Sequence, residues 1–513
     1  MNQYSPVHLI TELFQNTYKI HILSCFLSGI LATFSTQPHN FIPLLFFCVV
    51  PVYYFIIYTK PKHLFCIGFS FGFGWFLASL YWIISPLFIL GPSYYWVSPF
   101  AFLGLPLLLS LFWGWAFFMP ALIDLDKTGK IILLVIFWSL AEWLRGNILS
   151  GFPWSMIGSI MYFPLEVAYS ASYVGAYGQN LIVILLIVSP ILLIINNKKI
   201  ALIFVMTACF IIFTGIYKFH STKIIKSQNL VRIVQPAFTH KQKWDRKKFW
   251  LNMQNLAYLS KQEKSIPHLI IWPETAITTF PENLPQDFPS WLKEFFLSSK
   301  SYLITGMPTK KVENNSTKFF NSAVLFNEDG KLTDQYEKIK LVPFGEFIPF
   351  SNYFPFINIL VGENEFNKGK DKNLFYIEGI GKIRLLICYE AIFPGFINSK
   401  THPDLLVNIT NDYWFGNTIG PEQHLILSRQ RAIETGVPLI RVSNSGISSG
   451  FDPLGKELDR LKFGRTGFLD ITLPKKIETT FFYKRGNTIF FIMVLLLIGC
   501  YFLIKIFKTK FDQ

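Results

Sequence analysis

The chain has 513 residues, of which 51% are hydrophobic and 17% aromatic, and its formal net charge is +15 at pH 7. This composition is too apolar for an ordinary soluble protein, and the length allows several domains. No basic stripe stands apart from the flanks of the apolar runs, so a nucleic-acid partner is not expected.

The apolar residues gather into runs long enough for helices that cross a bilayer, which takes about 20 residues each. The runs cover residues 20–36, 41–59, 64–83, 97–123, 131–150, 167–195, 199–216 and 487–504. We therefore expect an α-helical membrane bundle of eight transmembrane helices. The first run could instead be a cleaved signal peptide, but its polar lead-in is long and no A-x-A-like site follows it.

Lysine placement predicts the orientation, because positive charge is enriched in cytoplasmic loops. Lysines follow every second run, whereas the loops 37–40 and 84–96 carry neither lysine nor arginine. The lysines concerned are Lys60, Lys62, Lys127, Lys130, Lys198, Lys199, Lys505, Lys508 and Lys510. Both termini are therefore expected in the cytoplasm and the large segment between the last two runs outside. The charge also suits a domain that works against anionic lipid.

Two charges interrupt the fifth run. Glu142 and Arg145 are three residues apart, which places them on one face of a helix. Charges in a membrane segment are functional candidates. We expect a structural ion pair near the end of the helix.

The segment between the seventh and eighth runs alternates short apolar, β-rich stretches with polar, helix-like ones. The expected strands are 229–236, 268–276, 301–308, 321–330, 382–390, 403–412 and 437–446, and the expected helices are 245–264, 287–299 and 421–435. NEDGK, at 327–331, is typical of a hairpin turn. The pattern predicts an α/β layered domain. The predicted domains are 1–216 (membrane), 217–485 (inserted) and 486–513 (last helix and tail).

Five of the six cysteines fall in the apolar runs, where a thiol packs as a small hydrophobic group. Cys388 alone lies in the inserted domain, at the end of the apolar stretch IRLLI. An unpaired thiol in an exported domain is a candidate nucleophile. The alternative is a buried, inert cysteine.

Two further polar residues are expected where strands end: Glu274 after LIIWP and Lys338 in YEKIKLVPFGE. Strand ends on one edge of a layered sheet converge in space. There, a glutamate can deprotonate a thiol, and a lysine can stabilise the thiolate and an oxyanion. Taken singly, Glu274 could begin a helix and Lys338 could be a solvated surface lysine.

Four separated motifs carry a resemblance to a known family. IIWPETA, YEKIKLVPFGEFIPF, LLICYEAIFPG and TNDYWFGNTIGPEQHLILSRQRAIETGVPLIRVSNSG resemble the nitrilase (carbon-nitrogen hydrolase) superfamily, and VQPAFTHKQKWD (234–245) does so more loosely. Such a domain after seven membrane helices and before one resembles the apolipoprotein N-acyltransferase family. The resemblance implies an α-β-β-α sandwich and a Glu-Lys-Cys triad.

Roles carried over by position are implied by this resemblance. Glu274 resembles the general base, Lys338 the oxyanion-stabilising lysine and Cys388 the nucleophile. The resemblance further implies a phospholipid acyl donor, a thioester on Cys388, and a diacylated apolipoprotein as the acceptor of the acyl chain on its α-amine. It also implies the bacterial inner membrane, with the catalytic domain in the periplasm.

Five more residues match supporting positions of the family. Glu346 matches a second glutamate at the site, and Tyr389 and Glu390 match the pair after the nucleophile. Trp244 matches a tryptophan on a loop near the substrate, and Trp154 is a candidate for the membrane side of the cavity. Tyr389 and Trp244 could instead be packing aromatics, Glu390 a carboxylate at a helix N-terminus, and Trp154 an interfacial tryptophan.

No metal or cofactor is expected, because no His, Cys and carboxylate cluster has ligand spacing. A monomer is expected. Two other functions remain open. One is a membrane-tethered amidase that uses the same triad, and the other is a catalytically silent scaffold or transporter, against which the intact Glu, Lys and Cys argue.

Overall fold

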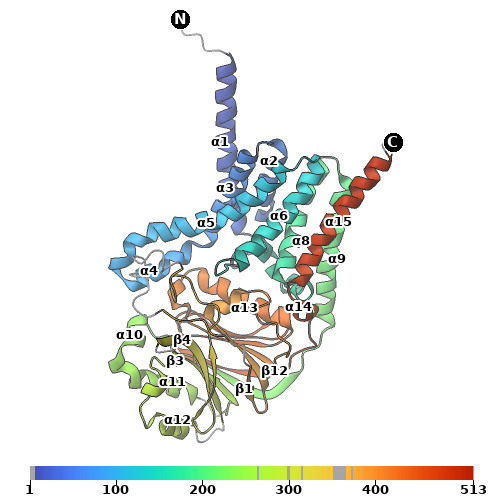
Figure 1. Ribbon diagram of the computed structural model, residues 1–513. Helices are drawn as coiled ribbons and strands as arrows, with labels where there is room; N and C mark the ends of the chain where they lie inside the picture. The colour runs from blue at the N-terminus through green and yellow to red at the C-terminus, as the bar shows by residue number, and fades with distance from the viewer. Residues whose placement is uncertain are drawn as a thin grey trace. The chain divides into compact units, whose positions relative to one another are not determined.

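The computed structural model describes residues 6–262, 265–296, 301–313, 316–349, 365–370 and 374–511, with side chains from residue 17 to residue 502 except those of 296 and 313. The chain divides into two compact units, one of Met1–Lys218 with Arg485–Gln513 and one of Phe219–Lys484. Figure 1 shows the helices of the first and the sheets of the second. The side chains of Lys505, Lys508 and Lys510, residues 297–299 of one predicted helix, and Phe350 of one motif lie outside the described residues.

The longer secondary-structure elements of the first unit are all helices. Its helices are α1 (Pro6–Thr33), α2 (Val49–Ile57), α3 (Pro61–Ser79), α4 (Ser85–Leu90), α5 (Ser98–Phe118), α6 (Lys127–Asn147), α7 (Leu165–Ala168), α8 (Ala171–Ile194), α9 (Lys198–Ser221) and α15 (Thr488–Phe511). A helix therefore occupies each of the apolar runs seen in the sequence.

Fewer helices than expected have the length and apolarity of a membrane span. Within the described residues, three segments qualify, Pro92–Leu122, Ala171–Ile194 and Lys198–Ser221, and a pair bent by 60° (Pro61–Ser79 with Tyr81–Leu90) would make a fourth. Two others are apolar but shorter: Ile42–Ile57 and Thr488–Phe502. The expected bundle of eight spans is thus not confirmed by length and composition.

Two glycines allow α1 and α3 to pack at close range. A Cβ atom on Gly29 of α1 would lie 2.2 Å from the carbonyl oxygen of Phe71, and one on Gly74 of α3 would lie 2.0 Å from that of Phe26. Such small residues let helix backbones approach each other closely.

The charges inside α6 form the ion pair that their spacing predicts. Arg145 Nη2 lies 2.7 Å from Glu142 Oε2, and both side chains are fully buried. Trp113 Nε1 donates to Glu142 over 2.5 Å, and Arg145 also donates to the carbonyls of Phe152 and Trp154. All these partners join segments of the helical unit, so the pair contributes to its packing.

The second unit contains two six-stranded sheets. Its strands are β1 (Lys226–Gln235), β2 (Leu269–Ile271), β3 (Tyr302–Glu313), β4 (Ser316–Phe326), β5 (Leu332–Glu337), β6 (Leu374–Ile377), β7 (Gly381–Ile387), β8 (Leu405–Thr410), β9 (Leu439–Ser443), β10 (Ser448–Phe451), β11 (Glu457–Leu461) and β12 (Gly467–Pro474). Its helices are α10 (His240–Trp244), α11 (Phe249–Ser260), α12 (Phe288–Phe296), α13 (Gly420–Thr435) and α14 (Phe481–Arg485), the last ending in the first unit.

The two sheets have the same plan. The orders are β12-β1-β2-β3-β4-β5 and β11-β10-β9-β8-β7-β6. In each sheet three neighbouring strands are parallel, β1-β2-β3 and β7-β8-β9, and the flanking strands are antiparallel. The turn NEDGK joins β4 to β5 as the predicted hairpin, with Asn327 N donating to Lys331 O. The carboxyl ends of the parallel strands provide the edge where sites form.

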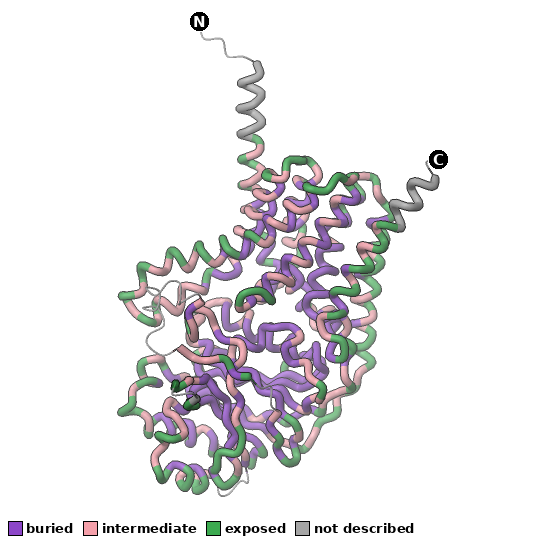
Figure 2. The backbone as a smooth tube through the Cα atoms, in the orientation of Figure 1, coloured by how far each residue is buried: buried purple, intermediate pink, exposed green. Residues whose placement is uncertain are grey.

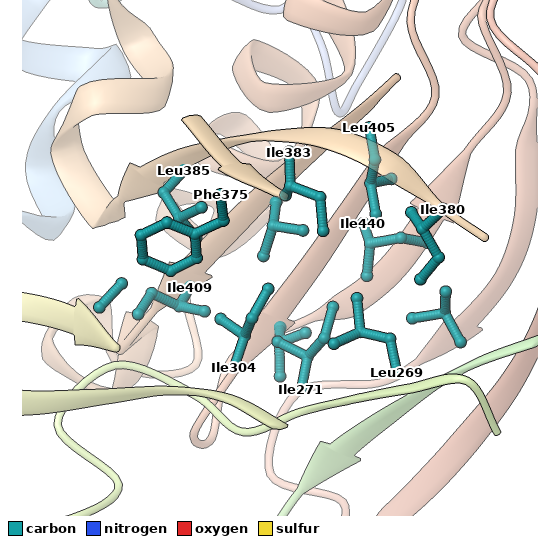
Figure 3. Packing of buried hydrophobic residues seen from close by; sticks show 14 of the residues in the cluster. Leu269, Ile271, Ile304, Phe375, Ile380, Ile383, Leu385, Leu405, Ile409 and Ile440 are labelled. Atoms are coloured by element: carbon teal, nitrogen blue, oxygen red, sulfur yellow. The ribbon is translucent and has the colours of Figure 1, made fainter. Parts of the chain in front are cut away.

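An apolar core lies between the sheets. Figure 3 shows Leu269, Ile271 and Ile304 of the first sheet facing Ile383 and other residues of the second. Branched aliphatic residues dominate this cluster, as is typical of strands that are covered on both faces. The parallel strands at the centre of both sheets, which supply many of these residues, are continuous apolar runs in the sequence.

Helices cover the outer faces. Side chains of α11 and α12 pack on the outward side chains of the first sheet, among them Met253, Leu256, Phe288 and Leu292. The opposite face of α11 is exposed (Figure 2). On the second sheet, Ser428 of α13 bonds to the outward side chains of β8 and β9. The predicted α-β-β-α sandwich is therefore confirmed.

Candidate active site

Glu274 stands just beyond the end of β2, in a loop fixed by the neighbouring strand. Trp272 N donates to Ile304 O, and Gly306 N donates to Pro273 O, over 2.9 and 3.1 Å. Gly306 is required here, because a Cβ atom would lie 2.3 Å from Thr275 N and 2.7 Å from Glu274 Cα. Strand β3 therefore holds the Glu274 backbone at a fixed place.

Lys243 supports the same loop from α10. Its Nζ donates to Glu274 O over 2.8 Å and to Thr275 Oγ1 over 2.5 Å, and its side chain is buried. Burial lowers the pKa of Lys243 to about 8, with the charge of Glu274 acting in the opposite direction. Thr275 adopts a left-handed φ of 45°, so a strained residue follows Glu274 directly.

Glu274, Lys338 and Glu346 form one hydrogen-bonded cluster. Lys338 Nζ lies 2.9 Å from the Glu346 carboxylate and 3.6 Å from Glu274 Oε1. Asn321, on β4, donates its Nδ2 to Glu274 over 2.8 Å and to Glu346 over 2.7 Å. The Lys338 backbone is held by Asn321 O and Gly369 N. The cluster thus fixes two carboxylates around one ammonium group.

The charge state of Lys338 follows from its neighbours. Burial alone would lower the pKa of Lys338, but the negative charges of Glu346 and Glu274 outweigh burial and raise it above its ordinary value. The ammonium group therefore stays charged at neutral pH. A fixed cation of this kind can stabilise an oxyanion.

Cys388 stands where β7 ends and the short helix η9 (Cys388–Ile392) begins. Its φ is +50°, a left-handed value that costs a non-glycine residue on the order of 1–2 kcal/mol. Burial raises the pKa of the Cys388 thiol to about 12, and the charge of Glu274 adds to this, whereas Lys338 and a hydrogen bond from Thr410 oppose it. The thiol is therefore neutral at rest, within the electrostatic reach of both other predicted triad members.

Glu390 ties the Cys388 turn to the Lys338 segment. Its carboxylate accepts from the backbone N–H groups of Ile387, Ile339 and Lys340 over 2.8, 2.7 and 3.1 Å, and Tyr336 Oη lies 2.9 Å away. It occupies the first turn of η9, as the helix N-terminal alternative predicted. It also fixes the residues that follow Lys338.

The remaining predicted residues lie in different surroundings. Tyr389 is nearly buried, with its ring edge-on to Phe393 at 5.0 Å between centroids. Trp244 ends α10, next to Lys243, and its side chain is 46% exposed. Trp154 belongs to the helical unit, where it is buried with its ring 4.8 Å from that of Trp82.

Lys338→Met is expected to destabilise the second unit by about 3–5 kcal/mol, because it leaves two buried carboxylates without their cation. Lys311→Met is the matched control. Lys311 pairs with Glu337, but its side chain is 51% exposed, so its loss should cost about 1 kcal/mol or less. Thermal unfolding followed by tryptophan fluorescence compares the two. Equal shifts of the melting temperature would contradict the buried cluster.

Comparison with known proteins gives two family matches. Residues 28–189 match the model described as "Apolipoprotein N-acyltransferase N-terminal domain", and residues 230–476 match "Carbon-nitrogen hydrolase". The second match contains every member of the cluster described above.

Curated relatives match almost the whole chain. A protein of Rickettsia bellii named "Apolipoprotein N-acyltransferase" is 33% identical over 95% of this chain and 98% of its own length. Proteins with the same name from Rickettsia prowazekii and Agrobacterium fabrum are each 32% identical, over 95% and 91% of this chain and 99% and 92% of their own lengths. The chain therefore belongs to the apolipoprotein N-acyltransferase family.

Proposed function

We propose that this protein transfers an acyl chain from a phospholipid, through a thioester on Cys388, to the α-amine of the diacylglyceryl-modified N-terminal cysteine of bacterial lipoproteins. The observation that carries the proposal is the buried cluster in which Lys338 lies 3.6 Å from Glu274 and both charges act on Cys388. The relatives' name supplies the reaction class.

The first half-reaction forms the thioester. Glu274 takes the proton of the Cys388 thiol as the sulfur attacks the ester carbonyl carbon of the phospholipid. The oxyanion that forms is stabilised by the Lys338 ammonium and by the backbone N–H of Tyr389. The C–O bond then breaks, Glu274 gives its proton to the departing oxygen, and the lysophospholipid leaves.

The second half-reaction releases the enzyme. The acceptor amine attacks the thioester carbon, a C–N bond forms, the C–S bond breaks, and Glu274 passes the amine proton to the departing sulfur. Hydrogen bonds with Glu346 and Asn321 fix the positions of Lys338 and Glu274, and Glu390 holds the Cys388 turn. The cycle returns to the neutral thiol and needs no cofactor.

We further propose that the helical segments anchor this chemistry at a membrane. Residues 1–216 and 486–513 would supply eight crossings of the bacterial inner membrane, and 217–485 would form the periplasmic catalytic domain, with both termini cytoplasmic. Both substrates are then lipids of the same bilayer. We propose that Trp244, which is exposed, contacts the substrate, that Trp154 contacts lipid within the membrane part, and that the enzyme acts as a monomer.

Transfer to the acceptor tests the function. Purified protein in liposomes of acyl-labelled phospholipid is incubated with a synthetic diacylated lipopeptide, and the peptide is analysed by mass spectrometry. The proposal predicts a gain of one labelled acyl chain on the α-amine, and none on a peptide whose amine is acetylated. Hydrolysis of small amides without transfer would instead establish the amidase alternative.

The close approach of β3 to Glu274 gives a second test. Gly306→Ala is expected to lower the transfer rate by about 10²-fold, because the added methyl group must displace the Glu274 backbone and a shift of about 1 Å costs this much. The matched control is Gly467→Ala, whose Cβ would meet only the end of the Leu461 side chain at 3.3 Å. Initial rates of the two purified variants are compared. A fully active Gly306→Ala would argue against a fixed Glu274.

A further inference from the structure

A buried polar network lies beneath the Cys388 turn, on the outer face of the second sheet. Its members come from β8, η10 (Asp412–Phe415), α13 and β9, and the proposed reaction uses none of them. They are Asn408, Asp412, His424, Ser428 and Arg441, all with fully buried side chains. Burying so many polar groups costs free energy unless they are hydrogen-bonded to one another.

Arg441 and Asp412 form the charged centre of this network. Arg441 Nη2 lies 2.5 Å from Asp412 Oδ2, and Arg441 Nη1 donates to Asn408 and Ser428. Burial alone would raise the pKa of Asp412, but Arg441 and His424 outweigh it and lower this pKa to about 2. The pair therefore remains ionised at neutral pH.

His424 links this centre to the nucleophile. Its Nε2 lies 3.2 Å from the carbonyl oxygen of Cys388, and its Nδ1 lies 3.0 Å from Arg441 Nη2 and 2.9 Å from Asp412 Oδ1. A carbonyl oxygen only accepts, so Nε2 carries the hydrogen. Nδ1 can accept from Arg441 when it is unprotonated and donate to Asp412 when it is protonated, and Nε2 donates to the Cys388 carbonyl in either case. Burial and the charge of Arg441 lower the pKa of His424, whereas the Asp412 carboxylate and the hydrogen bond to Cys388 act in the opposite direction.

The Cys388 carbonyl and the Tyr389 N–H belong to one planar peptide, in which the C=O and N–H bonds point in opposite directions. A donor in the buried network that binds the Cys388 carbonyl therefore makes the Tyr389 N–H point away from the network. Asn408 Nδ2, at 3.5 Å from the same oxygen, is the weaker second donor. Because Cys388 has a left-handed φ, this peptide needs such a hold to keep its orientation.

We propose that His424 is a positioning residue, whose Nε2–H holds the Cys388 carbonyl and thereby aims the Tyr389 N–H at the oxyanion on the acyl carbon. This inference rests on the proposed acyl transfer through Cys388. His424 itself touches neither substrate nor the sulfur in this role. Its loss should slow the step that develops the oxyanion and leave the intrinsic reactivity of the sulfur unchanged.

Two substitutions separate this role from simple packing. His424→Gln places an amide N–H near the position of Nε2, whereas His424→Asn places one only near Nδ1. Both put an uncharged amide beside Asp412 and Arg441, so their effects on stability should be alike. The rate of thioester formation should stay close to that of the wild type in the Gln variant and fall about 10- to 100-fold in the Asn variant, as for a misaligned oxyanion donor.

Alkylation by iodoacetamide is the second readout, because displacement at its saturated carbon forms no oxyanion. The proposal predicts equal alkylation rates at Cys388 in the wild type and both variants. His424→Ser, whose hydroxyl is too short to reach the Cys388 carbonyl, replaces the Asn variant if that variant fails to fold. Equal thioester rates in the Gln and Asn variants, or parallel losses of thioester formation and alkylation, would overturn the positioning role alone. A wild type that forms no thioester would overturn it together with the proposed function.

Discussion

Cys388→Ser is expected to abolish the thioester and to lower the acyl-transfer rate by more than about 10⁴-fold, because a serine hydroxyl is a far weaker nucleophile without a stronger base. Glu274 is a carboxylate, and it can assist a thiol whose pKa is about 12 but not an ordinary hydroxyl. The oxygen replaces the sulfur at the same backbone position, so folding should be preserved. The measurement is the initial rate of lipopeptide acylation in liposomes.

The control for this variant is Cys209→Ser. Cys209 is an exposed free cysteine on α9 and is remote in sequence from the catalytic cluster. Its substitution should leave the rate unchanged. A Cys388→Ser protein that retains more than a few per cent of the wild-type rate would show that the acyl chain does not pass through this sulfur.

Glu274→Gln is expected to lower acyl transfer by about 10²–10⁴-fold, the usual contribution of a general base. The same change should accelerate alkylation of Cys388 at pH 8–9. Glu274 raises the pKa of the thiol, so removing its charge lowers that pKa and increases the thiolate fraction at a given pH. Transfer and alkylation should therefore change in opposite directions, and both rates are measured on one preparation.

Glu282→Gln is the matched control, because Glu282 is exposed and belongs to the short helix Pro281–Asn283 that follows the same loop. It should alter neither rate. If Glu274→Gln slowed alkylation as strongly as transfer, the substitution would have displaced the nucleophile, and the general-base role would lose its support.

The strands at the centre of both sheets could be predicted because each is a continuous apolar run. Five strands were not predicted, and their sequences explain why. LTDQYE of β5 and ELDRL of β11 are polar and largely exposed, and they pair at sheet edges. SSGF of β10 is buried only because β9 and β11 flank it. β6 and β12 are also edge strands: β6 is a short strand paired in a local hairpin with β7, and β12 is held by pairing with β1, far away in the sequence.

The three proposed catalytic residues could be predicted from the sequence, but the residues that contact them could not. Glu274, Lys338 and Cys388 follow strands, which made their convergence predictable in principle. Lys243 lies in the basic stretch HKQKWDRKK, where nothing distinguishes it from solvated lysines, yet it is buried against the Glu274 loop. Asn321 and His424 acquire their roles only through contacts across the sheet, which a single sequence does not reveal.

The helical unit shows the limit of counting apolar residues. The runs do become helices, but several are shortened, bent or charged. α6 carries Lys127, Lys130, Glu142 and Arg145, and the third run breaks between Ser79 and Tyr81 with a bend of 60°. Apolar composition predicts that a segment avoids water, but it does not determine whether one straight helix crosses a bilayer.

Intact-protein mass spectrometry after incubation with phospholipid shows directly whether an acyl chain is carried on Cys388. The wild-type protein, reconstituted in liposomes without acceptor peptide, is compared with Cys388→Ser. Acyl transfer through Cys388 predicts a mass gain of one acyl chain in the wild type alone, removed by hydroxylamine and mapped to the peptide that contains Cys388. A folded, lipid-exposed wild-type protein without this adduct, or with an adduct on another residue, would rule out a thioester on Cys388.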